Sequence, residues 1–245
     1  MQKGLLIISI VLAVFGFSCK KENAGDCFKS VGNQTEEMRV LAPFDNIHID
    51  KDVDVVLVPD SQEFAIVRCG ENLVDLIKTD VSGTKLTITN KNRCNWVRSF
   101  KTPIIVEVHL KSIYKLYFTG SGEITCTDTL RSDNFLLEAY KASGNINLLV
   151  RNGWNQVVQH TGNADLKVGG WAPFNTMFSG GNGFLDCRGL HCKEAYILHK
   201  GTGNFYTTAT DYLGVEIAFT GDVYYTGAPA TIEDSITGTG RLISQ

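Results

Sequence analysis

The sequence predicts an all-β protein: a β-solenoid of the parallel β-helix type with a β-rich N-terminal portion. Three observations support this fold class. Short runs of alternating polar and apolar residues, bounded by turn residues, recur along the chain, as in half-buried strands. A phrase of Ser or Thr followed by Gly and a new alternating run returns through the second half. No long amphipathic helix pattern occurs in the 245 residues.

Composition excludes one class of partner. The chain is 43% hydrophobic and 20% charged, which is enough apolar material for a real core. Its formal net charge is −3, so no basic field points to nucleic acid, and nucleic acid is not predicted as a partner.

Residues 1–18 are predicted to be a lipoprotein signal peptide. One Lys precedes an apolar run that is short for a membrane span, and the run ends at Ser18-Cys19. After cleavage Cys19 would carry lipid and hold the protein on a membrane surface, as an outer-membrane lipoprotein whose orientation the sequence leaves open. The alternative is an ordinary secretory signal in which Cys19 is incidental. Residues 19–40 are predicted as a tether and N-terminal segment.

Residues 41–117 are predicted as the β-rich N-terminal portion of the domain. Five alternating or β-branched runs are separated there by Pro, Gly and Ser turn signals. The runs are FDNIHID, VDVVLV, FAIVRC, KLTITN and IIVEVHL. The segment GENLVDLIKT, which begins at Gly70, is the one predicted to make a helical turn.

Residues 118–245 are predicted as the solenoid repeats of the same domain. Ser/Thr-Gly pairs mark a period of about 20 residues, which suits one coil of a solenoid. The marking glycines are Gly122, Gly144, Gly162, Gly180, Gly203, Gly221 and Gly240. Gly allows a tight bend and a close approach of one coil to the next, so the phrase is interpreted as a folding device. In GNINLLV, Ile146 and Leu148 are expected to point inward.

The cysteines permit disulfides without fixing their pairing. Six remain besides Cys19, and an even number in an exported chain is typical of disulfide formation. Cys187 and Cys192 could close one loop. With His191 they could also suggest a metal site, but a second pair of ligands is missing, so neither a metal nor another cofactor is predicted.

The sequence contains no motif that predicts an enzyme. A G-x-S-x-G elbow is missing, and the phrases GTGNF and GGNGF lack the context and the GK[ST] ending of a phosphate loop. Asp50, Asp52 and Asp54 share one strand face and could hold Ca²⁺, but a turn with solvated carboxylates is favoured. No catalytic residue is therefore assigned.

Aromatic side chains of the repeat region are the candidate ligand-binding residues. Flat rings on a rigid β face can stack on sugars or anchor a protein partner, although core packing is the alternative for each. The candidates are Trp154, Trp171, Tyr206, Tyr224 and Tyr225. Because Tyr224 and Tyr225 are adjacent, they must face opposite sides of a strand.

Several blocks, in order, resemble the "putative auto-transporter adhesin, head GIN domain" lipoproteins of Gram-negative envelopes. They are FDNIHIDKDVDVVL, GENLVDLIKT, TGSGEIT, ASGNINL and FTGDVYYTGAPATI. DCFKSVG and NKNRCNWVRS are similar to a subgroup of the family, so the likeness covers residues 26–245. It implies a right-handed solenoid, in line with general chirality, and carries no catalytic residues. Cys27 and Cys94 lie in matching blocks, and a disulfide between them is hypothesised.

The expected function is that of a non-catalytic envelope lipoprotein whose rigid solenoid surface binds glycan or protein in adhesion. A structural or assembly role in the envelope is the alternative, and a polysaccharide lyase or hydrolase is a further one. The repeat phrase continues into the final SITGTGRLISQ, which leaves little sequence to cap the last coil. An uncapped coil exposes strand edges, so weak homo-oligomerisation through the C-terminal coil is also predicted.

Overall fold

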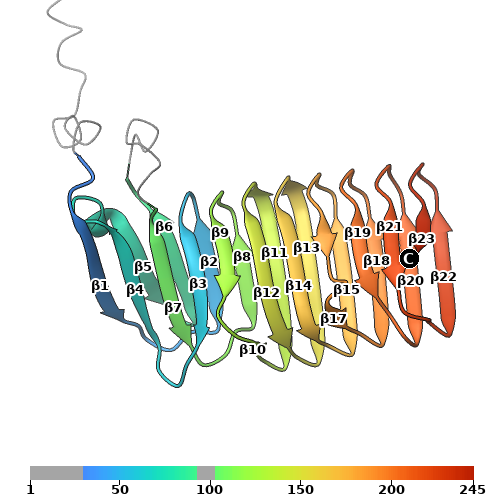
Figure 1. The fold of residues 1–245 in the computed structure, drawn as a ribbon, viewed down its shortest axis with the longest axis horizontal. Helices are drawn as coiled ribbons and strands as arrows, with labels where there is room; N and C mark the ends of the chain where they lie inside the picture. Colours follow the sequence, from blue (N-terminus) through green and yellow to red (C-terminus); the bar gives the residue numbers. More distant parts are fainter. Residues whose placement is uncertain (1–29, 93–102) are drawn as a thin grey trace, which may run out of the picture.

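The computed structural model describes residues 30–92 and 103–245. They form an elongated β-solenoid whose two walls are long, mainly parallel sheets of 13 and 10 strands (Figure 1). The 3₁₀ helix η1 (Val74–Leu76) confirms the helical turn predicted after Gly70. Among the described residues, no helix has the length and apolar character that a membrane span requires.

The 13-stranded sheet begins at the N-terminal end of the solenoid. Its order is β1 (Gln34–Val40), β4 (Phe64–Gly70), β7 (Ile105–Leu110), β3 (Asp54–Pro59), β9 (Glu123–Cys126), β12 (Asn145–Arg151), β14 (Asp165–Trp171), β16 (Leu185–Asp186), β19 (Phe205–Thr208), β21 (Val223–Thr226) and β23 (Leu242–Ser244). Two short strands lie beside this path, β10 (Leu130–Arg131) against β12 and β17 (Leu190–His191) against β14.

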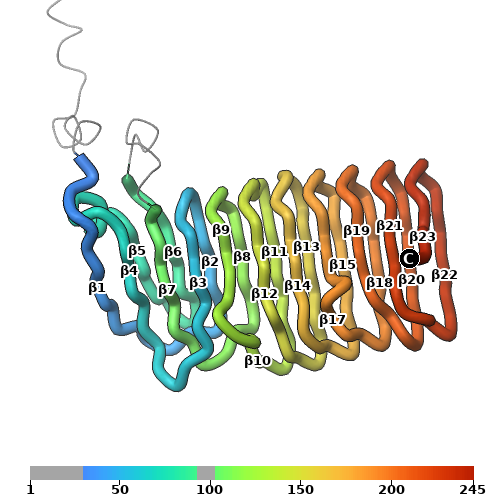
Figure 2. The backbone as a smooth tube through the Cα atoms, viewed as in Figure 1, coloured from blue at the N-terminus to red at the C-terminus, as the bar shows by residue number. Residues whose placement is uncertain are grey.

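The ten-stranded sheet forms the opposite wall. From the same end its order is β5 (Ile77–Ser82), β6 (Lys85–Asn90), β2 (Asn46–Asp50), β8 (Lys115–Phe118), β11 (Asn134–Ala142), β13 (Trp154–Gly162), β15 (Phe174–Ser179), β18 (Glu194–His199), β20 (Tyr212–Ile217) and β22 (Thr231–Ile236). A coil is one strand of this sheet followed by the next strand of the other, and Figure 2 shows the coils stacked side by side. The sheets continue across residue 117, because β8 spans it.

Chain order and spatial order differ at the N-terminal end. The coil β2–β3 lies between the coils β6–β7 and β8–β9. After β7 the chain therefore continues into β8 on the far side of its own first coil, β2–β3. Beyond it, β4, β1 and β5 pair antiparallel to their neighbours. The segment predicted at residues 19–40 thus contains a strand in its described part, because Gln34–Val40 is the edge strand β1.

One apolar row, here the central row, runs along the inner face of the ten-stranded sheet. Each member lies directly beside the next on the neighbouring strand, as its Cα partner in the sheet register, and all are buried. They are Leu86, Ile47, Leu116, Leu137, Val157, Met177, Ile197 and Val215. Strands stack about 4.8 Å apart, so each side chain packs on the next coil and the core is shared between coils. The inward positions predicted for Ile146 and Leu148 are confirmed.

Close backbone stacking explains the recurring Ser/Thr-Gly phrase. A Cβ atom on Gly144 would lie 1.9 Å from the carbonyl oxygen of Gly122, so only glycine fits at this contact. The stacked positions are Gly122, Gly144, Ala164, Gly183, Gly203, Gly221 and Gly240. Gly162 and Gly180, marked from the sequence, are out of phase with this line. Gly162 has a φ of +109° and stacks on Ala142 at a neighbouring bend.

Buried polar side chains support the bend after the strands of the ten-stranded sheet. Ser179 Oγ donates to Gln159 Oε1 at 2.9 Å and accepts the N–H of Gly181 at 2.9 Å. One coil further, His199 Nδ1 accepts the N–H of Gly201 at 3.2 Å, and burial lowers the pKa of this imidazole. These contacts satisfy glycine N–H groups that the bend removes from the sheet ladders.

The loop closure predicted for Cys187 and Cys192 is not made. Both are free, as are Cys69 and Cys126. The thiol of Cys192 instead donates to the backbone oxygen of Glu194 at 2.8 Å. Burial raises the pKa of Cys187 and of Cys192 to about 12, so both remain protonated core residues. The predictions for Cys19, Cys27 and Cys94 fall outside the described residues.

Candidate binding surface

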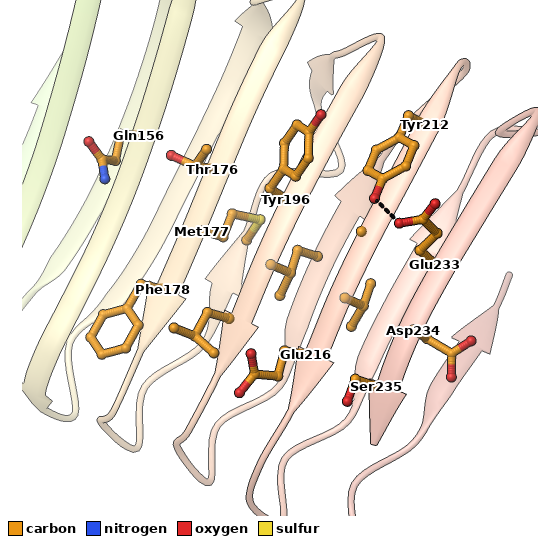
Figure 3. A pocket seen from close by; sticks show the side chains of 14 residues that line it. Gln156, Thr176, Met177, Phe178, Tyr196, Tyr212, Glu216, Glu233, Asp234 and Ser235 are labelled. Atoms are coloured by element: carbon orange, nitrogen blue, oxygen red, sulfur yellow. Dashed lines mark hydrogen bonds between the residues drawn. The ribbon is translucent and has the colours of Figure 1, made fainter. Parts of the chain in front are cut away.

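A groove of about 560 Å³ lies on the outer face of the ten-stranded sheet, over β13, β15, β18, β20 and β22 (Figure 3). Its lining includes Tyr196 and Tyr212, and we call it the tyrosine groove. Its lining residues are Gln156, Thr176, Met177, Phe178, Tyr196, Ile197, Leu198, Tyr212, Gly214, Val215, Glu216, Glu233, Asp234 and Ser235.

The two tyrosine rings lie against each other. Tyr196 on β18 and Tyr212 on β20 have ring centroids 5.1 Å apart, with ring planes inclined by 34°. Aromatic pairs at this separation attract each other beyond the area that they bury. Because Tyr196 is 44% exposed, much of this preformed aromatic platform faces solvent.

Gly214 provides the room for this pair. It is the Cα partner of Tyr196 on one side and of Glu233 on the other. A Cβ atom at position 214 would lie 2.9 Å from Cε1 of Tyr212, so that ring covers the glycine backbone. A side chain here would push the ring away, and the shape of the groove therefore depends on the glycine.

Carboxylates orient both phenol groups. Tyr196 Oη donates to Glu194 Oε2 at 2.9 Å, and Tyr212 Oη donates to Glu233 Oε2 at 2.8 Å, the contact drawn in Figure 3. These hydrogen bonds raise the pKa of both phenols above their ordinary value of 10.0. Both rings are thus held as neutral phenols in fixed orientations.

The remainder of the groove combines apolar surface with a few polar groups. Phe178 and Leu198 are Cα partners in an outward-facing row. Gln156 and Thr176 add an amide and a hydroxyl, and Thr176 Oγ1 has no hydrogen-bond partner in the described part of the chain. Glu216 adds a carboxylate, and the lining contains no Lys, Arg or His. Apolar surface with a few placed polar groups is typical of a small-molecule site.

An aromatic ridge extends the surface toward the N-terminal end. Trp154 on β13 and Phe174 on β15 are Cα partners and are 52% and 45% exposed. Phe174 is in turn the Cα partner of Glu194, which holds Tyr196. Trp154 is thus the one predicted candidate that lies on the face of the tyrosine groove.

The other four predicted candidates lie on the other wall, three of them outside the core. Trp171 ends β14, with the guanidinium of Arg151 5.5 Å from its ring centre. Tyr206 and Tyr224 stack at 5.0 Å with planes inclined by 15°, and Arg188 covers Tyr206 at 4.2 Å. Neighbours therefore occupy the ring faces of Tyr206, which makes this stack part of the coil packing.

The five candidates do not form one site. Tyr225 packs against the core whereas Tyr224 stacks outside, which confirms that they face opposite sides. Sequence reasoning missed Tyr196 and Tyr212. The available signal was Gly214 at an outward position of an alternating run, beside outward tyrosines in the same strand and in the preceding coil.

A second hollow on the same face, of about 620 Å³, is less suited to a ligand. It contains Lys85 and Lys115 beside Glu138. Lys115 is ion-paired with Glu138, which also contacts His160 Nε2 at 2.6 Å. Burial alone would raise the pKa of Glu138, but the hydrogen bonds from Lys115 and His160 outweigh it and the pKa is lowered. The charge of Lys115 is thus already compensated within the protein.

The fold recurs in solved structures. A "putative adhesin" from Bacteroides fragilis NCTC 9343 superposes with a TM-score of 0.78 at 18% identity, over 87% of this chain and 97% of that chain. A "putative lipid binding protein" from Parabacteroides distasonis ATCC 8503 gives 0.67 at 19% identity, over 87% and 97%. A "putative adhesin" from Parabacteroides merdae ATCC 43184 gives 0.62 at 17% identity, over 88% and 98%. At such identities the likeness concerns the fold alone. No curated protein sequence matches the chain.

The family resemblance noted from the sequence is confirmed. The model of one family matches residues 43–229, which is most of the chain and includes every strand from β2 to β21. The protein therefore belongs to the family described as "Putative auto-transporter adhesin, head GIN domain".

Proposed function

We propose that the protein is a non-catalytic binding protein of the cell envelope and that its tyrosine groove takes up glycan. Membership in a family described as adhesins supports a binding role. The observation that carries the proposal is the preformed pair of Tyr196 and Tyr212, with amide, hydroxyl and carboxylate groups around it.

The chemistry of the groove suits a saccharide. The C–H face of a sugar ring packs on an aromatic face, while its hydroxyls need hydrogen-bond partners within reach. Tyr196 supplies the aromatic face, and Gln156, Thr176 and Glu216 supply acceptors and donors. The strands hold these groups rigidly, which lowers the entropic cost of binding.

The alternative of a lyase or hydrolase receives less support. The lining carries the carboxylates of Glu216, Glu233 and Asp234, but a basic residue to act with them is not among the lining residues. Glu233 is also engaged by the phenol of Tyr212. These carboxylates are better suited to accepting hydrogen bonds from sugar hydroxyls than to cleaving a glycosidic bond.

Binding to immobilised neutral oligosaccharides tests the groove. The Tyr196→Ala substitution removes the exposed ring, and we expect it to weaken binding at least about tenfold, since anchoring aromatics are worth 2 kcal/mol or more. Tyr206→Ala is the matched control, because it removes a half-buried tyrosine from the other wall. Equal affinity of the Tyr196→Ala variant and the unaltered protein would refute the assignment.

The proposed anchor is lipid on Cys19, at the membrane-proximal start of the mature chain. Protease treatment of intact cells, with lysed cells and a Cys19→Ala variant as controls, tests it. Digestion in intact cells would place the groove on the outer surface, as adhesion requires. Protection until lysis would favour a periplasmic assembly role. If the Cys19→Ala variant still fractionates with the membrane as the unaltered protein does, the lipid anchor is refuted.

A further inference from the structure

The central row ends on a charged residue. Eight buried apolar side chains follow one another from Leu86 to Val215, and the next Cα partner in the row is Asp234 on β22. Strand alternation assigns Asp234 to the inward side, because Glu233 before it reaches out to Tyr212. The last coil thus carries a carboxylate where every earlier coil carries an apolar side chain.

Apart from Ser244, the Cα partner of Tyr225, the rest of this end layer is apolar and open. Ile232 and Ile236 flank Asp234 in the inward positions and are 40% and 42% exposed, whereas their Cα partners Leu213 and Ile217 are fully buried. Leu242 on β23 is partly buried on the opposite wall. Within the described part of the chain, nothing pairs with the outer edges of β22 and β23. We call these two strands and their inward side chains the end face.

Two identical end faces are a poor match. A two-fold axis that brings the two β22 strands together would pair them antiparallel and bring Asp234 against Asp234 or against an isoleucine of the other copy. The other two-fold arrangement would pair β22 with β23 of the other copy, which carries no basic residue either. Strand Thr231–Ile236 carries no basic residue, so no register supplies a cation. The basic residue nearest to this strand in the sequence is Arg241, and its Nη2 forms an ion pair with Oδ2 of Asp222 at 2.9 Å. A carboxylate buried without a counter-charge opposes docking.

We propose that the end face docks the edge strands of a partner protein that places a Lys or Arg over Asp234, between apolar residues that cover Ile232 and Ile236. Main-chain pairing with an exposed edge would give affinity, and the side-chain pattern would give specificity. Asp234 thereby keeps identical copies apart. On this proposal, heterotypic docking takes the place of the homotypic association predicted from the sequence, at an end face that adjoins the tyrosine groove, whose lining includes Asp234.

A charge-reversed copy of the protein serves as a defined partner. Sedimentation velocity is measured for the unaltered protein, for the Asp234→Lys variant and for their equimolar mixture, after circular dichroism has shown matching folds. We expect both proteins alone to be monomeric and the mixture to form a 1:1 complex, bound at least about tenfold more tightly than either homodimer. An Asp234→Val variant, which restores an apolar row, should self-associate.

A second substitution locates the contact. Ile232→Glu, introduced into both members of the mixture, places a charge in the apolar part of the end face and should abolish the complex. The proposal is overturned if the folded Asp234→Lys variant and the unaltered protein do not associate, or if the unaltered protein dimerises as tightly as the mixture. It is also overturned if the complex survives Ile232→Glu, because docking would then lie elsewhere.

Discussion

The two ends of the solenoid finish the same core in different ways. At the N-terminal end, β1 adds an inward layer of Thr35, Glu37 and Arg39 over the buried β4. Arg39 donates to Glu37 at 2.8 Å and to the backbone oxygens of Ile77 and Val74 at 2.6 and 3.0 Å, and so ties the two walls together. At the C-terminal end, β22 adds a layer with a lone central carboxylate, and no strand covers it among the described residues.

The difference shows what prevents a further coil from adding to the end of a parallel solenoid. A solenoid coil presents unpaired edges and an apolar layer, which invite another coil. At the N-terminal end the outermost strands run antiparallel to their neighbours, and the charge of Arg39 is met by Glu37 and by backbone oxygens. The C-terminal end carries Asp234 without such partners among the described residues, which is why we propose that it opposes docking of an identical end and favours a complementary one.

The largest expected effect comes from matched isoleucines in the last two coils. Ile217 is fully buried and its Cα partner Ile236 is 42% exposed. Ile217→Ala should cost about 3 kcal/mol of unfolding free energy, because it leaves a cavity, and Ile236→Ala about 1 kcal/mol or less. Denaturant unfolding followed by circular dichroism measures both. Equal losses would mean that the end face is covered in solution.

Two arginines give the next comparison, one at each end. The Arg39 side chain is 18% exposed and bridges two walls, whereas the Arg241 side chain is 72% exposed and pairs with Asp222 alone. Arg39→Ala leaves backbone oxygens without partners and should cost about 2–3 kcal/mol. Arg241→Ala should cost at most about 1 kcal/mol, as exposed pairs do. A reversed order in thermal unfolding would contradict the N-terminal cap.

The smallest effect is a pH dependence in the C-terminal half. Burial lowers the pKa of His199 from its ordinary 6.5, so the folded state favours the neutral imidazole. Below about pH 6.5 the unfolded chain takes up a proton more readily than the folded one, and stability falls with the pH until the folded imidazole also titrates. His199→Gln should flatten this part of the profile of melting temperature against pH. An unchanged slope would exclude His199 as the cause.

The sequence predicted the type of candidate surface, outward aromatic side chains, but not most of the residues that form it. Outward aromatics on a rigid solenoid were expected from alternation, and Trp154 was identified by it. Tyr196 and Tyr212 were not, because they meet only through the register between β18 and β20, which depends on coil length and on the bend geometry. For the same reason Tyr206 was chosen although Arg188 and Tyr224 cover its ring.

The sequence by itself determined the fold class, the inward positions and the repeat. Period-two alternation assigns each side chain to a face, and a period near 20 residues assigns each strand to a coil, and both are local properties of the chain. The tertiary structure decided what depends on pairing between distant segments. It inserted β2–β3 between later coils, turned Gln34–Val40 into a capping strand and brought two tyrosines together over Gly214. It also placed Asp234 at the end of a row that only the stacked coils create, because a row across coils has no counterpart in any one stretch of sequence.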